Sequence, residues 1–135
     1  NYVIYRLPII AGKSHNPHTL LNYIYKSIKE SSEIKVELFA SRYIVDIDDV
    51  VSIVNLTAPA LNRQKFNLNF DNKIKITDLI SVFEDVLGKK AIIKKVQSGS
   101  SYNVNNKHLK IFLSQNSIDP SPSSDIKKMI QKYYL

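Results

Sequence analysis

The sequence lacks cysteine and tryptophan, and its 135 residues include only three glycines and one methionine. Without cysteine the chain has no disulfide framework, no thiolate nucleophile and no cysteine-ligated metal cluster. No apolar run approaches the roughly 18 residues that a bilayer crossing needs, and the first residues do not resemble a secretory signal. We therefore expect a cytoplasmic protein with no membrane partner.

Positive charge dominates the composition, because 19 Lys and Arg residues face 12 Asp and Glu residues, giving a net charge of +7. Such an excess favours anionic ligands, among them phosphate-bearing small molecules. The cations are spread along the chain, so we interpret most of them as solvated helix faces and do not expect nucleic acid as a partner. The length, with 44% hydrophobic and 23% charged residues, suits a single globular domain over residues 1–135.

Runs of β-branched, aromatic and alternating apolar residues predict five strands. The first is apolar throughout, which is typical of a buried strand, and Pro8 limits it because proline cannot donate to a strand ladder. The predicted strands are 2–7, 34–39, 42–47, 65–70 and 91–96. Residues 11–15 and 97–106 are predicted as loops, and 71–73 as a polar turn.

Apolar residues at a helical period predict four helices between these strands. We expect Asn16 to cap the first, which ends near Ser31, and Thr77 to cap the third, which Gly88 ends. The second runs from about 48 to 56, and the last follows a turn at 119–124 with Ser123 or Ser124 as its cap. Strands and helices alternate throughout, so the sequence predicts an α/β fold.

Two motifs suggest chemistry but have simpler explanations. Gly12-Lys13-Ser14 lies between a strand and a helix, as a phosphate loop does, but that motif needs a glycine five positions earlier, where this chain has Leu7. Asp46, Asp48 and Asp49 could serve as catalytic carboxylates, yet a helix start already accounts for negative charge there. We therefore assign neither motif a catalytic role.

Four segments together carry a resemblance to one enzyme family. Residues 5–12 resemble a strand and loop R-x-x-N-x-x-G, and 16–21 the helix after it. Residues 42–50 resemble the signature R-D-[FWY]-[IL]-[HY]-V-x-D-[LVH] with its Arg-to-Asp spacing, and the helix patterns at 76–89 and 126–134 resemble two further helices. In these segments the chain resembles the extended short-chain dehydrogenase/reductases, which are NAD(P)-dependent nucleotide-sugar epimerases, dehydratases and reductases.

The resemblance covers essentially the whole chain but only the C-terminal part of the family. It implies the last strands of a Rossmann-type sheet, with 2–7 and 65–70 as parallel outer strands, plus a small substrate-binding lobe. The cofactor motif G-x-x-G-x-x-G is absent from the sequence, and we assign no residues to the family's catalytic pair Y-x-x-x-K. We therefore expect NAD or NADP to be held by a preceding N-terminal Rossmann half, and this segment alone to be inactive. The resemblance also implies an enzyme of polysaccharide biosynthesis. A homodimer is a further possible assembly.

The resemblance implies roles for six residues. Arg42 would clamp the diphosphate of a nucleotide sugar with its planar guanidinium; the alternative is a surface arginine paired with a nearby aspartate. Asp49 would be structural, capping or buttressing a helix. Further substrate contacts would come from the loop after the first strand, namely Lys13, Ser14, Asn16 and His18. The sequence departs from the family pattern at Ile9, where the family often has asparagine, and at Tyr43, where it has aspartate.

A rival interpretation is a non-enzymatic, basic α/β module that binds an acidic partner or nucleic acid. Under the enzyme interpretation, a segment without its N-terminal half should expose apolar surface. We expect this surface on the first strand and on the helix over 79–87.

Overall fold

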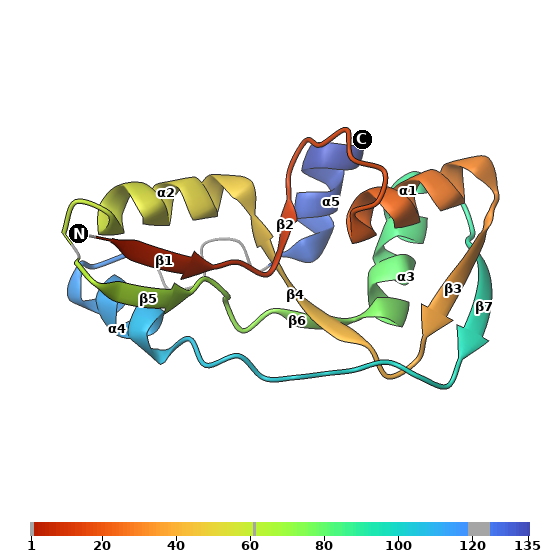
Figure 1. Cartoon of the computed structure of the whole chain (residues 1–135). Coiled ribbons are helices and arrows are strands. Elements are labelled where there is room, and N and C mark those ends of the chain that lie inside the picture. The colour runs from red at the N-terminus through yellow and green to blue at the C-terminus, as the bar shows by residue number, and fades with distance from the viewer. Residues whose placement is uncertain (1, 61, 119–124) are drawn as a thin grey trace.

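The computed structural model describes residues 2–60, 62–118 and 125–135, arranged as an elongated α/β structure (Figure 1). The α/β class expected from the sequence is confirmed. The elements in chain order are β1 (Val3–Arg6), β2 (Ile9–Ala11), α1 (Leu20–Glu30), β3 (Glu33–Glu37), β4 (Ser41–Asp46), α2 (Ile47–Thr57), β5 (Gln64–Asn67), β6 (Lys73–Lys75), α3 (Ile76–Leu87), β7 (Ile92–Val96), α4 (Lys107–Gln115) and α5 (Ile126–Tyr134).

The strands form three small sheets. β1 pairs with β5 in parallel, with Val3 opposite Gln64 and Arg6 opposite Asn67, which confirms the expected parallel pair. β2 pairs in parallel with β4, whose other edge pairs with β6 in antiparallel, and β3 pairs in parallel with β7. Figure 1 shows β1 and β5 between α2 and α4, and the β3–β7 pair at the far end beside α1 and α3.

Two hydrophobic cores stabilise the fold, one on each side of β4. The first joins α1, β3, α3 and α5 around side chains such as Ile24, Phe83 and Ile130. The second joins α2, β5 and α4 around Phe66 and Leu113. Strand β4 contributes to both, with Ile44 in the first core and Val45 in the second, because successive strand residues point to opposite faces.

The third predicted helix, α3, ends as expected but begins differently. Gly88 follows it in the left-handed conformation at φ 62°, as predicted. Its N-cap is Lys75 and not Thr77, and no side chain makes a capping hydrogen bond. The reason is that β6 runs directly into the helix, where the Ile76 amide donates to the Ala40 carbonyl at 3.0 Å.

The first helix begins three residues later than predicted, at Leu20, with Thr19 in the N-cap position. The side chain of Asn16 accepts the His18 amide at 3.0 Å, and Asn22 donates to the Asn16 carbonyl at 2.8 Å. These bonds make 16–18 a turn of its own ahead of the helix. The end at Ser31 is confirmed.

The last helix is capped by Asp125, whose side chain accepts the Lys128 amide at 3.1 Å, and not by a serine. The predicted turn at 119–124, with Ser123 and Ser124, lies outside the described residues. The predicted apolar stripe of α5 is confirmed, because Met129 and Ile130 are buried in the first core.

Three elements were not foreseen from the sequence: β2, β6 and α4. β2 and β6 have three residues each, too few to show a period. Ala11 of β2 lies in a predicted loop, and Lys73 of β6 lies in the predicted polar turn. α4 buries only Leu109 and Leu113 in a polar stretch. None of the helices in the described parts of the chain has the length and apolar content that a bilayer crossing requires.

The exposed apolar surface differs from the expected one. In α3, Leu79, Ile80 and Phe83 are buried in the first core, so the prediction of exposure there is wrong. On the first strand the prediction of exposure holds, and β1 is not the fully buried strand that its composition suggested. The exposed apolar side chains in and beside β1 and on α2, which together we call the β1–α2 surface, are Tyr2, Ile4, Leu7, Val51 and Leu56, each about half exposed.

Candidate functional site

A cavity of about 690 Å³ opens where the parallel strands β1 and β5 end. Ligands in α/β folds bind at the carboxyl ends of parallel strands. We call it the arginine cavity, because Arg6 and Arg42 both line it and its described lining includes no carboxylate. Its other polar side chains are Tyr43, Asn67, Asn69, Tyr102, Asn103 and Asn105. Two fixed positive charges with amide donors suit an anionic ligand.

Arg42 is held in this cavity by backbone carbonyls. Its Nη1 donates to the Ser41 carbonyl at 2.8 Å and to the Ser100 carbonyl at 2.9 Å. These described partners of Arg42 are backbone carbonyls and not aspartates, and its role in ligand binding stays a prediction. Guanidinium offers five donors in a fixed plane, so the two bonds to Nη1 restrict the orientation of the whole group and leave the donors of its other nitrogens available.

We call residues 98–105 the strap, and its residues 102–105 line one side of the arginine cavity. Asn67 and Asn69 donate their side-chain amides to strap carbonyls at 2.7 and 3.3 Å. Lys73 Nζ donates to a strap asparagine side chain at 2.6 Å, and the Tyr43 hydroxyl accepts a strap amide at 3.4 Å. Three of these four side chains, Tyr43, Asn67 and Asn69, also line the cavity.

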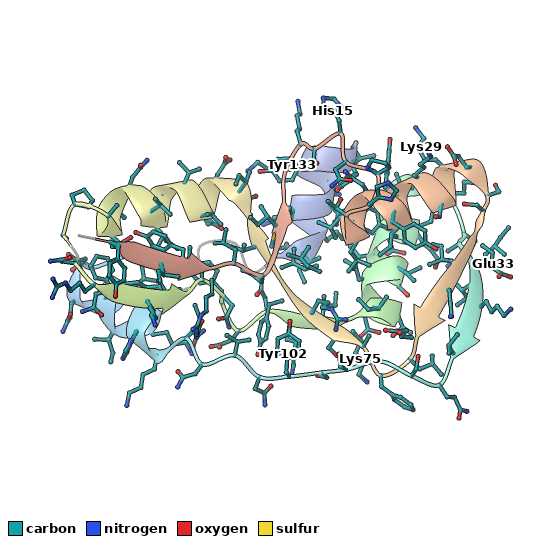
Figure 2. The ribbon with its side chains drawn as sticks, in the orientation of Figure 1. His15, Lys29, Glu33, Lys75, Tyr102 and Tyr133 are labelled. Carbon is teal, nitrogen blue, oxygen red and sulfur yellow. The ribbon has the colours of Figure 1, made fainter. Side chains whose placement is uncertain are left out.

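The loop residues predicted as substrate contacts lie elsewhere. Figure 2 shows His15 of that loop at the opposite side of the molecule from Tyr102 of the strap. Lys13 and Ser14 line a separate cavity of about 760 Å³ beside α1 and α5, and Asn16 and His18 do not line the arginine cavity. The structure therefore does not bring these four residues together with Arg42, and their role in ligand binding stays a prediction.

A second polar cluster lies at the other end of β4 and ties it to α5. Asp46 caps α2 by accepting the Asp48 amide at 2.9 Å. The same carboxylate accepts the Tyr133 hydroxyl at 2.6 Å and Lys132 Nζ at 3.0 Å. The capping role therefore belongs to Asp46, whereas Asp49 lies in the first turn of the helix. Among the described residues no group of three His, Asp or Glu could hold a metal ion.

The environment of Asp46 favours its charged form. Burial alone would raise its pKa, but the hydrogen bonds from Tyr133, the Asp48 amide and Lys132 outweigh burial and lower the pKa below 3.8. Burial and the bond to Asp46 raise the pKa of Tyr133, and hydrogen bonds to Asp48, Tyr133 and Asp46 raise the pKa of Lys132. Asp46 and Lys132 therefore carry opposite charges at neutral pH, and Tyr133 keeps its proton.

Sequence reasoning missed part of the site. Arg6 stands at the start of the R-x-x-N-x-x-G resemblance but received no role. Asn67 and Asn69 lie within the predicted strand 65–70 and belong to no motif. Their positions could have indicated a role, because Arg6 and Asn67 are the last residues of β1 and β5, the two strands that we expected to be parallel. Side chains at that edge are candidates for ligand contacts.

The chain matches no family profile and no curated protein sequence. Solved structures resemble it closely in fold. The dTDP-glucose 4,6-dehydratase of Bacillus anthracis, in complex with NAD, superposes with a TM-score of 0.79 and 14% identity, over 98% of this chain and 43% of that one. The chain has the fold of the C-terminal part of NAD-dependent sugar epimerases and dehydratases.

Two more structures support that fold. The UDP-glucose 4-epimerase of Thermotoga maritima, solved with UDP-glucose, has a TM-score of 0.72 and 17% identity, over 98% of this chain and 45% of that one. The UDP-glucuronic acid 4-epimerase of Bacillus cereus, solved with a fluorinated UDP-glucuronic acid and NAD, has a TM-score of 0.75 and 18% identity, over 98% and 43%. The chain therefore spans less than half the length of each of these three structures.

The residues present do not fit a dinucleotide. A Rossmann cradle needs glycines clustered at the first βα turn, so that backbone amides reach the pyrophosphate. Here a Cβ at Gly12 would meet Ile47 Cγ2 at 3.1 Å, Gly88 ends α3, and Gly99 lies in the strap. These three glycines are far apart in the sequence and form no such turn.

Proposed function

We propose that this chain is the substrate-binding part of an NAD(P)-dependent nucleotide-sugar epimerase, dehydratase or reductase. In this proposal the guanidinium of Arg42 binds the diphosphate of the nucleotide sugar. The observation that carries it is the anchored Arg42 in a carboxylate-free cavity, beside Arg6 and several asparagine amides, at the ends of two parallel strands. A planar, permanently charged donor is well suited to a diphosphate.

The same proposal assigns the cofactor to another part of the enzyme. NAD or NADP would be held by an N-terminal Rossmann half, which would add strands beside β1 and cover the β1–α2 surface. The length of the matched structures, and the NAD bound in the B. anthracis dehydratase, support this division. The segment alone would then be inactive. We further propose a cytoplasmic enzyme of polysaccharide biosynthesis, and leave a homodimer open.

Titration of UDP and UDP-glucose into the chain by calorimetry tests the role of Arg42. Arg42→Ala should weaken binding of both ligands by roughly 10- to 100-fold, the range of one to two charge-assisted hydrogen bonds. Arg42→Lys should recover only part of this loss, because an ammonium keeps the charge but cannot present two parallel donors.

Arg63→Ala is a matched control, because Arg63 is exposed and does not line the arginine cavity. It should leave both dissociation constants unchanged. If Arg42→Ala behaves like Arg63→Ala, the diphosphate role is wrong, and Arg42 serves only to fix the strap.

A further inference from the structure

A smaller hollow of about 280 Å³ adjoins the arginine cavity on the side of α4. The two share Arg6, Asn67 and Asn105 as lining residues, so they lie side by side. The hollow adds Lys65 from β5 and the pair Lys107 and His108 from the start of α4. We call it the β1–α4 hollow.

The positive charge of the β1–α4 hollow has no described counter-charge. Its lining contains no carboxylate, and neither Arg6, Lys65 nor Lys107 forms an ion pair with a described residue. One turn further along α4, Lys110 does pair with Asp71, so carboxylates are available nearby but do not face the hollow. Three cations that line one concavity make the electrostatic potential inside it more positive, which attracts anions.

Exposed lysines on a flat surface usually serve only solvation. This cluster differs because it lines a concavity, includes the amides of Asn67 and Asn105, and shares Arg6 with the arginine cavity. We propose that the β1–α4 hollow binds a second anionic group, a carboxylate or phosphate, on the ligand whose diphosphate Arg42 binds. This inference rests on the proposed function and narrows its substrate class to nucleotide sugars that carry an extra negative charge.

The test compares UDP, UDP-glucose and UDP-glucuronic acid, which share a diphosphate and differ in the sugar carboxylate. Calorimetry on the chain should give a dissociation constant about tenfold lower for UDP-glucuronic acid than for UDP-glucose, as expected for one charge-assisted contact. The double variant Lys107→Gln, His108→Gln should abolish that preference and leave UDP-glucose binding unchanged. Lys94→Gln, an exposed lysine on β7, is the matched control and should keep the preference.

A titration with inorganic phosphate separates the two sources of charge. Phosphate should shift the His108 ring signals in nuclear magnetic resonance spectra, and a stronger shift than with glucuronate would identify a phosphate as the natural group. Equal binding of UDP-glucose and UDP-glucuronic acid, with no His108 response to either anion, overturns the inference but leaves the Arg42 proposal intact. Failure of UDP to bind, with a His108 response to phosphate, refutes the diphosphate role and keeps the hollow as an anion site.

Discussion

Asp46 shows how one side chain can serve several elements. Its side chain is 5% exposed, it caps α2, and it accepts hydrogen bonds from Tyr133 and Lys132 of α5. A buried charge is tolerated only when its hydrogen-bonding capacity is satisfied in this way. The carboxylate therefore fixes the position of the last helix relative to β4.

Replacing Asp46 with asparagine should lower the free energy of unfolding by about 2 kcal/mol at neutral pH, because a buried acceptor of charged and neutral donors loses its charge. Asp48→Asn, which alters a 71% exposed partner of the same lysine, should cost less than about 1 kcal/mol. Urea unfolding followed by circular dichroism measures both. Equal losses for the two variants would contradict the assignment.

The pH dependence of this loss follows from the direction of the pKa shift. The pKa of Asp46 is lowered from 3.8 in the folded chain, so the carboxylate contributes its full stability above about pH 4. That contribution is lost as the pH falls through the folded-state pKa. The difference between wild type and Asp46→Asn should therefore shrink steadily below about pH 4 and be absent once Asp46 is protonated.

At the residue level, the sequence could indicate Arg42 but not its surroundings. The spacing from Arg42 to Asp49 identified the arginine, and strand pairing then placed Arg6 near it. The contact between Arg42 and the Ser100 carbonyl joins residues 58 positions apart, and no local pattern predicts such a contact. The four loop residues were predicted from the rule that ligands bind at the carboxyl ends of strands. In the structure they follow β2, whose last residue Ala11 lies opposite Asp46, at the end of β4 away from Arg42.

Among the elements, the strap depends on a glycine at a close crossing. Gly99 has φ 113°, and a Cβ there would lie 2.6 Å from the Ala40 amide nitrogen. Gly88 at the end of α3 also has positive φ, but nothing lies within 4 Å of its Cβ position. Both glycines meet a conformational need, and only Gly99 also meets a steric one.

Gly88→Ala should therefore lower the free energy of unfolding by about 1 kcal/mol, the usual cost of a left-handed alanine. Gly99→Ala should cost at least about 2 kcal/mol, because the backbone must also move apart. Chemical denaturation of the two variants measures the difference. An equal cost at both positions would show that the strap does not lie as close to β4 as the structure has it.

Long, strongly periodic elements could be predicted from the sequence, and short ones could not. α3 and α5 bury side chains at helical spacing, so their apolar stripes identified them. α4 buries Leu109 and Leu113 through contacts with β5, and β6 exists because β4 offers it an edge. The predicted start of α3 was wrong because a backbone hydrogen bond from Ile76, and not a side-chain cap, marks the beginning of this helix.

For the whole molecule, the β1–α2 surface is the main unpartnered feature. The β1–β5 sheet has only two strands, and a parallel pair of this kind is normally covered on both faces and extended at its edges. Ile4 and Leu7 on this surface are 42% and 46% exposed. Burying apolar area of this kind drives association.

The isolated chain should therefore self-associate at micromolar to millimolar concentrations, as chains with unpaired edges and apolar patches do. The double variant Ile4→Lys, Leu7→Lys should shift it toward monomer in sedimentation velocity. Ile92→Lys, at a 50% exposed position on β7, serves as a control for added charge and should have a smaller effect. A wild-type chain that remains monomeric throughout would refute this use of the surface.

Strand β4 begins beside the strap, with Arg42 as its second residue, and ends at Asp46 in the tie to α5. Between these ends it supplies Ile44 to one core and Val45 to the other. A shift of this strand along its own axis would therefore move the guanidinium, the helix cap and both cores together. A change at the contact between Asp46 and α5 is therefore expected to alter the position of Arg42 in the arginine cavity, although the two residues lie near opposite ends of β4.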